Sequence, residues 1–129
     1  MLGTEEQVDI PISPSANNYL KLYDADEQRR AWNVANFLEF GHLEISQSTG
    51  VTQGAVAAMP AELRRRLMEI GTICELVAEF FHGDVKKTIL WFNEPNMMLG
   101  NISPRSLIRV GRYKTLYKFI VDSLSGYAA

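Results

Sequence analysis

Residues 88–127 read TILWFNEPNMMLGNISPRSLIRVGRYKTLYKFIVDSLSGY, and the breaks in this stretch divide it into short helices. The segment Lys86–Phe92 has a helical, apolar composition. It is expected to stop before Pro95, because the residue that precedes a proline is pushed out of the α region. Asn96 is then placed to cap a single helical turn, and Gly100 stands where a helix end favours a left-handed residue.

The second half of the stretch predicts two more helices. Ser103 followed by a proline is a typical helix start, which predicts a helix over Pro104–Val110 that ends at Gly111. A last helix is expected over Arg112–Leu124, with Gly126 ending it. Its apolar face at helical spacing consists of Tyr113, Leu116, Tyr117, Ile120, Val121 and Leu124.

The order of these features resembles the toxin-binding C-terminal domain of the Xre/ParS/MbcA family of antitoxins. The residues that carry the resemblance are Trp91, Pro95, Asn96, Leu99, Gly100, Pro104, Leu107, Ile108, Gly111, Tyr113, the 116–124 face and Gly126. The short link at 107–111 is closer to the MbcA branch than to the longer-looped Xre branch. The chain departs from the family pattern at Asn101, where a second glycine is usual, and at Ser103, where threonine is commoner.

The resemblance implies that the chain binds a RES-domain toxin, an enzyme that degrades NAD, and covers its active site. Tyrosine and tryptophan are favoured interface anchors, since they bury a large area and keep a polar tip. The expected toxin-binding residues are Trp91, Asn96, Pro104, Tyr113, Tyr117 and the tail Ser125, Gly126, Tyr127, Ala128 and Ala129. The pattern alone is equally compatible with an ordinary helical bundle in which Trp91 is a core residue, and it leaves open which side chains face a partner.

The composition is that of a globular protein. The chain has 129 residues, enough for one domain or two very small ones, with 47% hydrophobic and 22% charged residues. A single cysteine, Cys74, excludes an internal disulfide and suits a reducing compartment. No apolar run reaches the roughly 18 residues of a membrane span, and no secretory signal is seen at the N-terminus. A cytoplasmic protein without membrane contact is expected.

The N-terminal region begins with an irregular segment. Met1–Tyr23 has little periodicity, which predicts a flexible arm that is either disordered or adds as a strand to a partner through residues 8–10. A helix is expected over Asp24–Phe40, with Asp24 as N-cap and Gly41 ending it.

Residues 43–59 read LEISQSTGVTQGAVAAM and fit a helix-turn-helix within a region spanning 24–60. The residues at the offsets of that motif are Ile45, Ser46, Gly50, Val51 and Val56. Thr52, Gln53 and Gly54 would lead the second helix into a DNA groove, and Gln53 could read adenine. Arg64, Arg65 and Arg66 would then contact the phosphates.

The charge distribution argues against that role. Residues 1–60 hold eight acids against three bases, and no Lys or Arg lies between His42 and Pro60. A DNA-binding protein gains much of its affinity from basic contacts with phosphate. A helix-turn-helix that serves packing or dimerisation is therefore the competing interpretation.

Ala61–Phe81 is expected to form the longest helix, which connects the two halves within the region 61–129. Leu63, Leu67, Ile70, Cys74, Val77 and Phe81 repeat at 4-3-4-3-4 spacing, and Ile73, Leu76 and Phe80 widen this apolar seam. The seam is expected to face the core of the same chain more than a second chain. Cys74 on this seam is interpreted as a small hydrophobic residue.

Catalytic chemistry is not indicated. His42 and His82 stand alone near expected helix ends, no Cys/His cluster has metal-ligand spacing, and no glycine-rich phosphate loop follows a strand. We therefore expect an all-α protein that is not an enzyme and needs no cofactor or metal. The expected function is an antitoxin that forms a homodimer or a larger hetero-oligomer with its RES-domain toxin, with autoregulation through operator DNA as an additional role. The alternative is a helix-turn-helix repressor whose C-terminal half only dimerises it.

Overall fold

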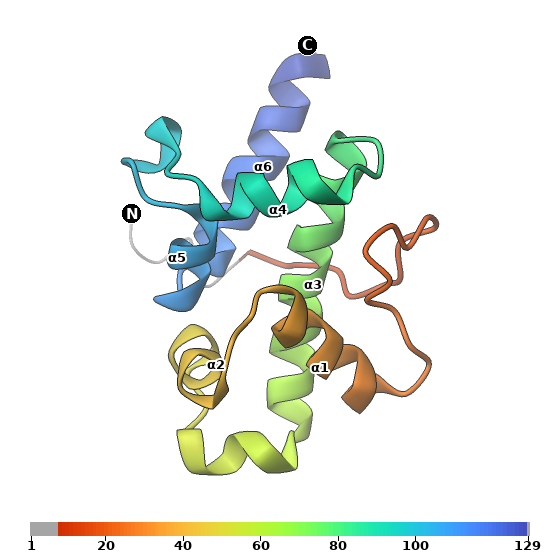
Figure 1. Cartoon of the computed structure of the whole chain (residues 1–129), viewed down its shortest axis with the longest axis vertical. Coiled ribbons are helices and arrows are strands. Elements are labelled where there is room, and N and C mark those ends of the chain that lie inside the picture. The colour runs from red at the N-terminus through yellow and green to blue at the C-terminus, as the bar shows by residue number, and fades with distance from the viewer. Residues whose placement is uncertain (1–7, 129) are drawn as a thin grey trace.

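The computed structural model describes residues 8–128, with side chains from 8 to 125, and this part of the chain is all-helical (Figure 1). The all-α prediction is therefore confirmed. In chain order the elements are α1 (Glu27–Phe37), α2 (His42–Thr49), the 3-10 helix η2 (Gln53–Ala58), α3 (Ala61–Phe80), α4 (Val85–Asn93), the 3-10 helix η3 (Met97–Leu99), α5 (Pro104–Arg109) and α6 (Tyr113–Ala128).

Helix α3 runs through the centre of the molecule, with α1 and α2 beside its first half and α4 and α6 around its second half (Figure 1). The predicted seam lies in the core, where Leu63, Leu67, Ile70, Cys74 and Val77 are buried. The prediction for Phe80 was wrong, because its side chain is 51% exposed. Residue spacing places Phe80 at the edge of the seam, and no helix covers it there.

Helices α1 and α3 approach each other closely at Gly71. A Cβ atom at this position would lie 2.8 Å from Cγ2 of Val34, so a larger side chain would push α1 away. Val34 and Ala35 of α1 are buried against this contact. The small residues thus allow α1 to close over the first half of α3.

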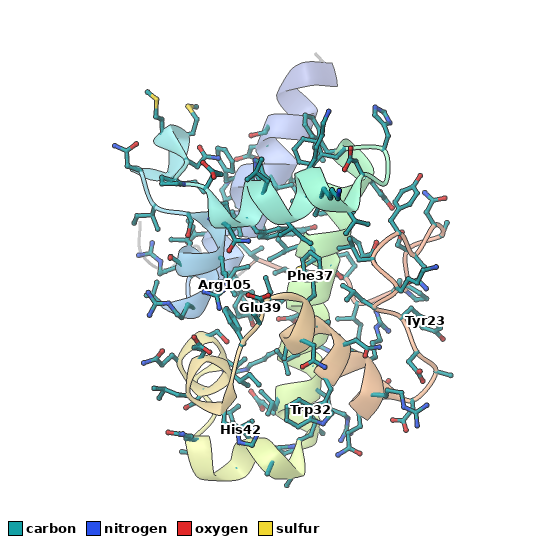
Figure 2. The ribbon with its side chains drawn as sticks, viewed as in Figure 1. Tyr23, Trp32, Phe37, Glu39, His42 and Arg105 are labelled. Atoms are coloured by element: carbon teal, nitrogen blue, oxygen red, sulfur yellow. The ribbon has the colours of Figure 1, made fainter. Side chains whose placement is uncertain are left out.

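One hydrophobic core extends through both halves of the chain, from Ile10 to Ile120. Arg105 of α5 reinforces the junction from outside this core (Figure 2). Its Nε donates to the Leu38 carbonyl at 2.7 Å, and its Nη2 donates to the Glu39 carbonyl at 3.1 Å. The guanidinium also lies 4.9 Å from the ring centre of Phe40. The C-terminal end of α1 is therefore tied to the C-terminal half of the chain.

The helix ends in residues 93–112 match the sequence prediction. The Asn96 side chain accepts a hydrogen bond from the Met98 amide at 2.9 Å, and Gly100 ends η3 with a φ of 76°. Ser103 caps α5 through the Ser106 amide at 3.1 Å, with Pro104 in the first turn. Local cap chemistry fixes these boundaries, which explains why they could be read from the sequence.

Three helix boundaries, both ends of α1 and the end of α6, differ from the prediction by three or more residues, and the other predicted helix ends lie within one residue of those observed. Helix α1 starts at Glu27 with Asp26 as its cap, because Asp24 instead accepts a hydrogen bond from the Asp26 amide at 2.8 Å. The helix ends at Phe37, since Glu39 takes a left-handed conformation with a φ of 59°. Helix α6 runs on to Ala128, so the predicted stop at Gly126 is wrong; a glycine within a helix costs only about 1 kcal/mol.

The region of the predicted helix-turn-helix holds a shorter second element. Gly50 ends α2 in a left-handed conformation with a φ of 80°, as the turn of that motif requires. The segment that follows is the 3-10 helix η2, not an α-helix, so the motif is not confirmed. Met59 ends η2 with a φ of 48°, directly before Pro60, where the α conformation is disfavoured.

The described part of the N-terminal segment, residues 8–23, forms no helix or strand and packs against α1 and α3. Ile10 and Leu22 are buried in the core. Thr72 donates a side-chain hydrogen bond to the Pro11 carbonyl, and Asn33 donates one to the Leu22 carbonyl at 3.1 Å. This burial was not predicted, since the sequence indicated a flexible arm; residues 1–7 of that arm lie outside the described residues.

Candidate protein-binding surface

Large apolar side chains are exposed mainly on the C-terminal half of the described chain. Met97 is 85% exposed, Met98 is 78% exposed, and Phe80 and Leu90 are also more than half exposed. The remaining exposed members on this half are Val85, Ile89, Ile102, Val110 and Leu124. Only Tyr23 and Leu43 represent this class in residues 8–79. Clustered exposed apolar side chains mark interaction surfaces, whereas single ones need no explanation.

An apolar groove lies among these side chains, where the end of α3 meets α4, η3 and α6. It encloses about 160 Å³. Its lining residues are Leu76, Val77, Phe80, Phe81, Trp91, Asn96, Met98, Phe119, Ile120, Ser123 and Leu124. Such a groove can accept apolar side chains of another protein, since most of its lining is aromatic or aliphatic.

The apolar groove continues around Trp91 into a wider and shallower hollow of about 430 Å³. The hollow is lined by Phe81, Lys87, Leu90, Trp91, Glu94, Pro95 and Asn96. Phe81, Trp91 and Asn96 line both depressions. Lys87 and Glu94 give the hollow charged edges, which resembles the polar rim of a protein interface.

Trp91 is the predicted contact residue that lies most centrally in this surface. Its ring is half-buried and stands edge-on to the ring of the buried Phe92, with 5.2 Å between the ring centres. The contact fixes the indole while one side of it remains at the groove. Trp91 therefore combines a core contact with a position at the groove, and its contact with a toxin stays a prediction.

Asn96 shapes the turn that carries the exposed methionines. Besides capping η3, its backbone amide donates to the Ile102 carbonyl at 3.1 Å, which closes the loop that contains η3. The closed loop holds Met97 and Met98 away from the core. Methionine is flexible and polarisable, so it suits a surface that adapts to a partner. Asn96 thus positions the contact surface as well as lining it.

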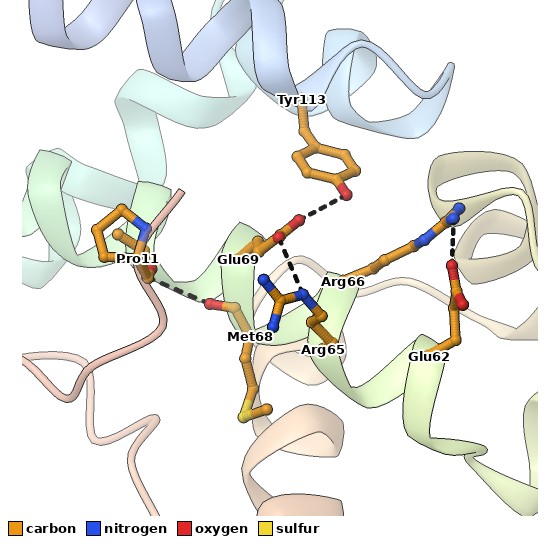
Figure 3. Close-up of polar contacts among 8 residues, drawn as sticks. Pro11, Glu62, Arg65, Arg66, Met68, Glu69 and Tyr113 are labelled. Carbon is orange, nitrogen blue, oxygen red and sulfur yellow. Dashed lines mark hydrogen bonds and ion pairs between the residues drawn. The ribbon is translucent and has the colours of Figure 1, made fainter. Parts of the chain in front are cut away.

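Two predicted contact residues lie in the core. Pro104 is buried at the first turn of α5, and Tyr113 is 6% exposed at the start of α6. The Tyr113 hydroxyl donates to Glu69 Oε1 at 2.9 Å, and Arg65 lies 3.7 Å from the other oxygen of this carboxylate (Figure 3). Burial, and then the Glu69 charge, raise the pKa of Tyr113. Both residues therefore support the fold and do not reach the surface.

The other predicted contact residues lie along α6. Tyr117 is half-buried against the core, and Ser125 is exposed near the C-terminal end of the helix. Residues 126–128 continue the helix, and Ala129 lies outside the described residues. In Figure 1 the last turns of α6 project beyond the other helices.

The predicted DNA-binding arginines all lie beside acidic side chains of the chain. Thr52, Gln53 and Gly54 are exposed around the start of η2. The three arginines have carboxylate partners within the chain: Arg64 pairs with Glu27, Arg65 with Glu69 and Arg66 with Glu62. Arg66 also donates to the Thr49 carbonyl at the end of α2. These contacts use the guanidinium groups to hold α2 and α1 on α3.

Sequence reasoning missed the exposed apolar residues that form most of the surface. Phe80 was assigned to the buried seam, and Leu90, Met97 and Met98 received no role. The adjacent methionines between a cap residue and a glycine were an available signal, since a single turn can bury little of its own surface. Leu90 carries no such signal, because exposed and buried leucines look alike in one sequence.

Cys74 and His42 are both packed against other side chains. The Cys74 thiol is buried, and burial raises its pKa far above the usual range. His42 stacks on Trp32, with 5.8 Å between ring centres, at the end of the molecule away from the groove (Figure 2). Across the described residues, no group of three or more His, Cys, Asp or Glu side chains is arranged to hold a metal. None of the helices in residues 8–128 combines the length and hydrophobicity that a bilayer span needs.

Comparisons with known proteins do not assign the chain to a group. No family model, no curated protein and no solved structure matches it.

Proposed function

We propose that this chain is an antitoxin that binds a RES-domain, NAD-degrading toxin and covers its active site. In this proposal the chain is not itself an enzyme; it inhibits by contact. The contact surface is the apolar groove, the hollow around Trp91, the η3 methionines and the end of α6. The cytoplasm, where NAD is available to such a toxin, is the expected location.

The single observation that carries the proposal is the concentration of exposed apolar side chains on the C-terminal half. This is the half whose sequence resembles the toxin-binding domain of the Xre/ParS/MbcA antitoxins. Among the residues that carry the resemblance, Asn96 and Gly100 flank η3, Pro104 begins α5, and Gly111 follows the end of α5 with a positive φ. The exposed apolar surface and the sequence resemblance therefore both support a toxin-binding role for the C-terminal half of the chain.

Operator binding is not included in the proposal. The arginines at 64–66 are paired with acidic residues of the chain, and η2 is shorter than a typical recognition helix. A protein that reads DNA relies on basic side chains that are free to contact phosphate. The repressor alternative therefore has less support than the antitoxin interpretation.

Co-purification tests the proposal. The full chain is co-expressed with a tagged RES-domain enzyme encoded beside it, and the tagged enzyme is captured. A stable hetero-oligomer that elutes as one peak in size-exclusion chromatography is expected, and its NAD-degrading activity should be suppressed. Separate elution of the two proteins, with full toxin activity, would contradict the proposal.

A further inference from the structure

Residues 8–23, the N-terminal strap, cross α1 and α3 without forming a helix or strand, and their polar contacts with these helices are few. Ser15 donates to Glu79 Oε2 at 2.7 Å, and Arg30 donates to the Ile12 carbonyl. With the Thr72 contact to Pro11 and the Asn33 contact to Leu22, these bonds are spread along the segment. Local detachment of the segment would break these bonds and expose Ile10 and Leu22, which are buried in the core.

The strap contains a constrained turn. Asn18 and Lys21 both have positive φ values, 48° and 57°, which residues other than glycine seldom adopt. The turn places the Tyr19 ring against Gly83, where a Cβ atom would come within 2.6 Å of it. The turn is held by local hydrogen bonds, from the Lys21 amide to the Asn18 carbonyl at 3.0 Å and from the Tyr23 amide to Asn18 Oδ1 at 3.1 Å, and by its fit to the helices.

A carboxylate is buried beneath this turn. Glu75 of α3 is 9% exposed, and neither of its side-chain oxygens has a hydrogen-bond partner of normal geometry. An ionised carboxylate in such a position is costly, whereas the protonated form is tolerated. Burial, which is the largest cause, and the nearby Glu79 raise the pKa of Glu75 above its ordinary value.

Groups from each neighbouring element face Glu75. The backbone amides of Tyr19 and Leu20 in the strap approach the carboxylate and lower its pKa in part, and the Arg30 charge on α1 acts in the same direction. On α3, Glu79 opposes them. Tyr23, Arg30 and Glu79 also line the cavity of about 140 Å³ that Glu75 shares with the strap. Burial outweighs the groups that favour the charged form.

We propose that the N-terminal strap is a proton-controlled latch, which stays docked on α1 and α3 while Glu75 is protonated and detaches as Glu75 ionises. Once the strap has detached, Glu75 is in water and has its ordinary pKa. Docking is therefore fully favoured below that ordinary value and weakens as the pH rises through the raised value of the docked state.

Detachment would also change the neighbouring apolar groove. Leu76 lines both the cavity beneath the strap and the groove at the end of α3. Release of the strap would extend the exposed apolar surface along α3 toward α1. Release of the strap would change only the exposed surface of the chain. The latch therefore does not depend on which partner binds that surface.

Hydrogen–deuterium exchange of the full chain, measured between about pH 5 and pH 8 and divided by the intrinsic rate at each pH, tests the latch. The protection of residues 8–23 should fall by up to about tenfold for each pH unit that separates the pKa of docked and detached Glu75. The protection of α5, which packs against α2, α4 and α6, should stay constant. Constant protection of the strap in the wild type would overturn the proposal.

Three variants identify the titrating group. Glu75→Gln, or Glu75→Met if the glutamine variant does not fold, removes the ionisation and should keep the strap protected across the pH range. Glu79→Gln removes the nearby negative charge, so the fall should move to lower pH. A fall of the same size and position in the Glu75 variant as in the wild type would show that another group is responsible and overturn the proposal.

Discussion

At the scale of single residues, a few polar side chains hold together segments that are distant in sequence. Arg105 is the clearest example, because its guanidinium satisfies two backbone carbonyls at the end of α1 and covers the Phe40 ring. The sequence shows only that Arg105 follows a proline at a helix start. Its partners lie 66 and 67 residues away, so this role could be found only from the structure.

Replacement of Arg105 should therefore destabilise the whole chain. We expect Arg105→Ala to lower the free energy of unfolding by about 1–3 kcal/mol, since it leaves the Leu38 and Glu39 carbonyls without their donor. Urea denaturation followed by circular dichroism measures this change. Arg109→Ala, on the same helix, is the control and should have a smaller effect; equal losses would contradict the role of Arg105.

Cys74 leads to a second prediction at this scale. Burial raises the pKa of its thiol, so the reactive thiolate is scarce in the folded protein. We expect a thiol-specific reagent to modify Cys74 slowly at neutral pH and rapidly after denaturation. The absorbance of the released chromophore gives both rates. Equal rates in the two states would show that the seam of α3 opens readily.

At the scale of elements, the sequence predicts helix boundaries that depend on neighbouring residues. It does not predict boundaries that depend on contacts with distant residues. The caps at Asn96 and Ser103 were predictable because each side chain bonds an amide within three residues. The start of α1 was not, since Asp24 and Asp26 are both good caps and the sequence does not rank them. The 3-10 form of η2 reflects Gly54 within it and Pro60 after it, which weaken an α-helix there.

The end of α6 gives a prediction for one element. Deleting Ser125–Ala129 removes the last turn of a helix that projects from the molecule, so the melting temperature and helix content should change little (Figure 1). Neutralisation of the toxin should nevertheless weaken, because the proposal places this end in the contact surface. A toxicity assay in co-expressing cells measures it. Full neutralisation by the shortened chain would show that residues 125–129 are not needed to inhibit the toxin.

At the scale of the whole molecule, the chain has one core and an uneven surface. The core could be predicted in outline, because the α3 seam and the α6 face follow helical spacing. The burial of the strap could not, since residues 8–23 lack any periodic pattern. Of the predicted contact residues, Trp91 and Asn96 line the apolar groove, and their contact with a toxin stays a prediction. Pro104 and Tyr113 were also predicted to contact the partner, but both are buried. Helical spacing does not show which neighbouring element covers a side chain.

The central claim is that the exposed apolar surface of the C-terminal half inhibits a toxin, and one titration tests it most directly. NAD degradation by the RES-domain enzyme is measured while the full chain is added. The wild type and Leu43→Asp, which changes an apolar side chain that is 53% exposed on α2, should inhibit equally. Met98→Asp should need at least about 30-fold more protein, equivalent to roughly 2 kcal/mol. Equal inhibition by all three proteins would contradict the claim.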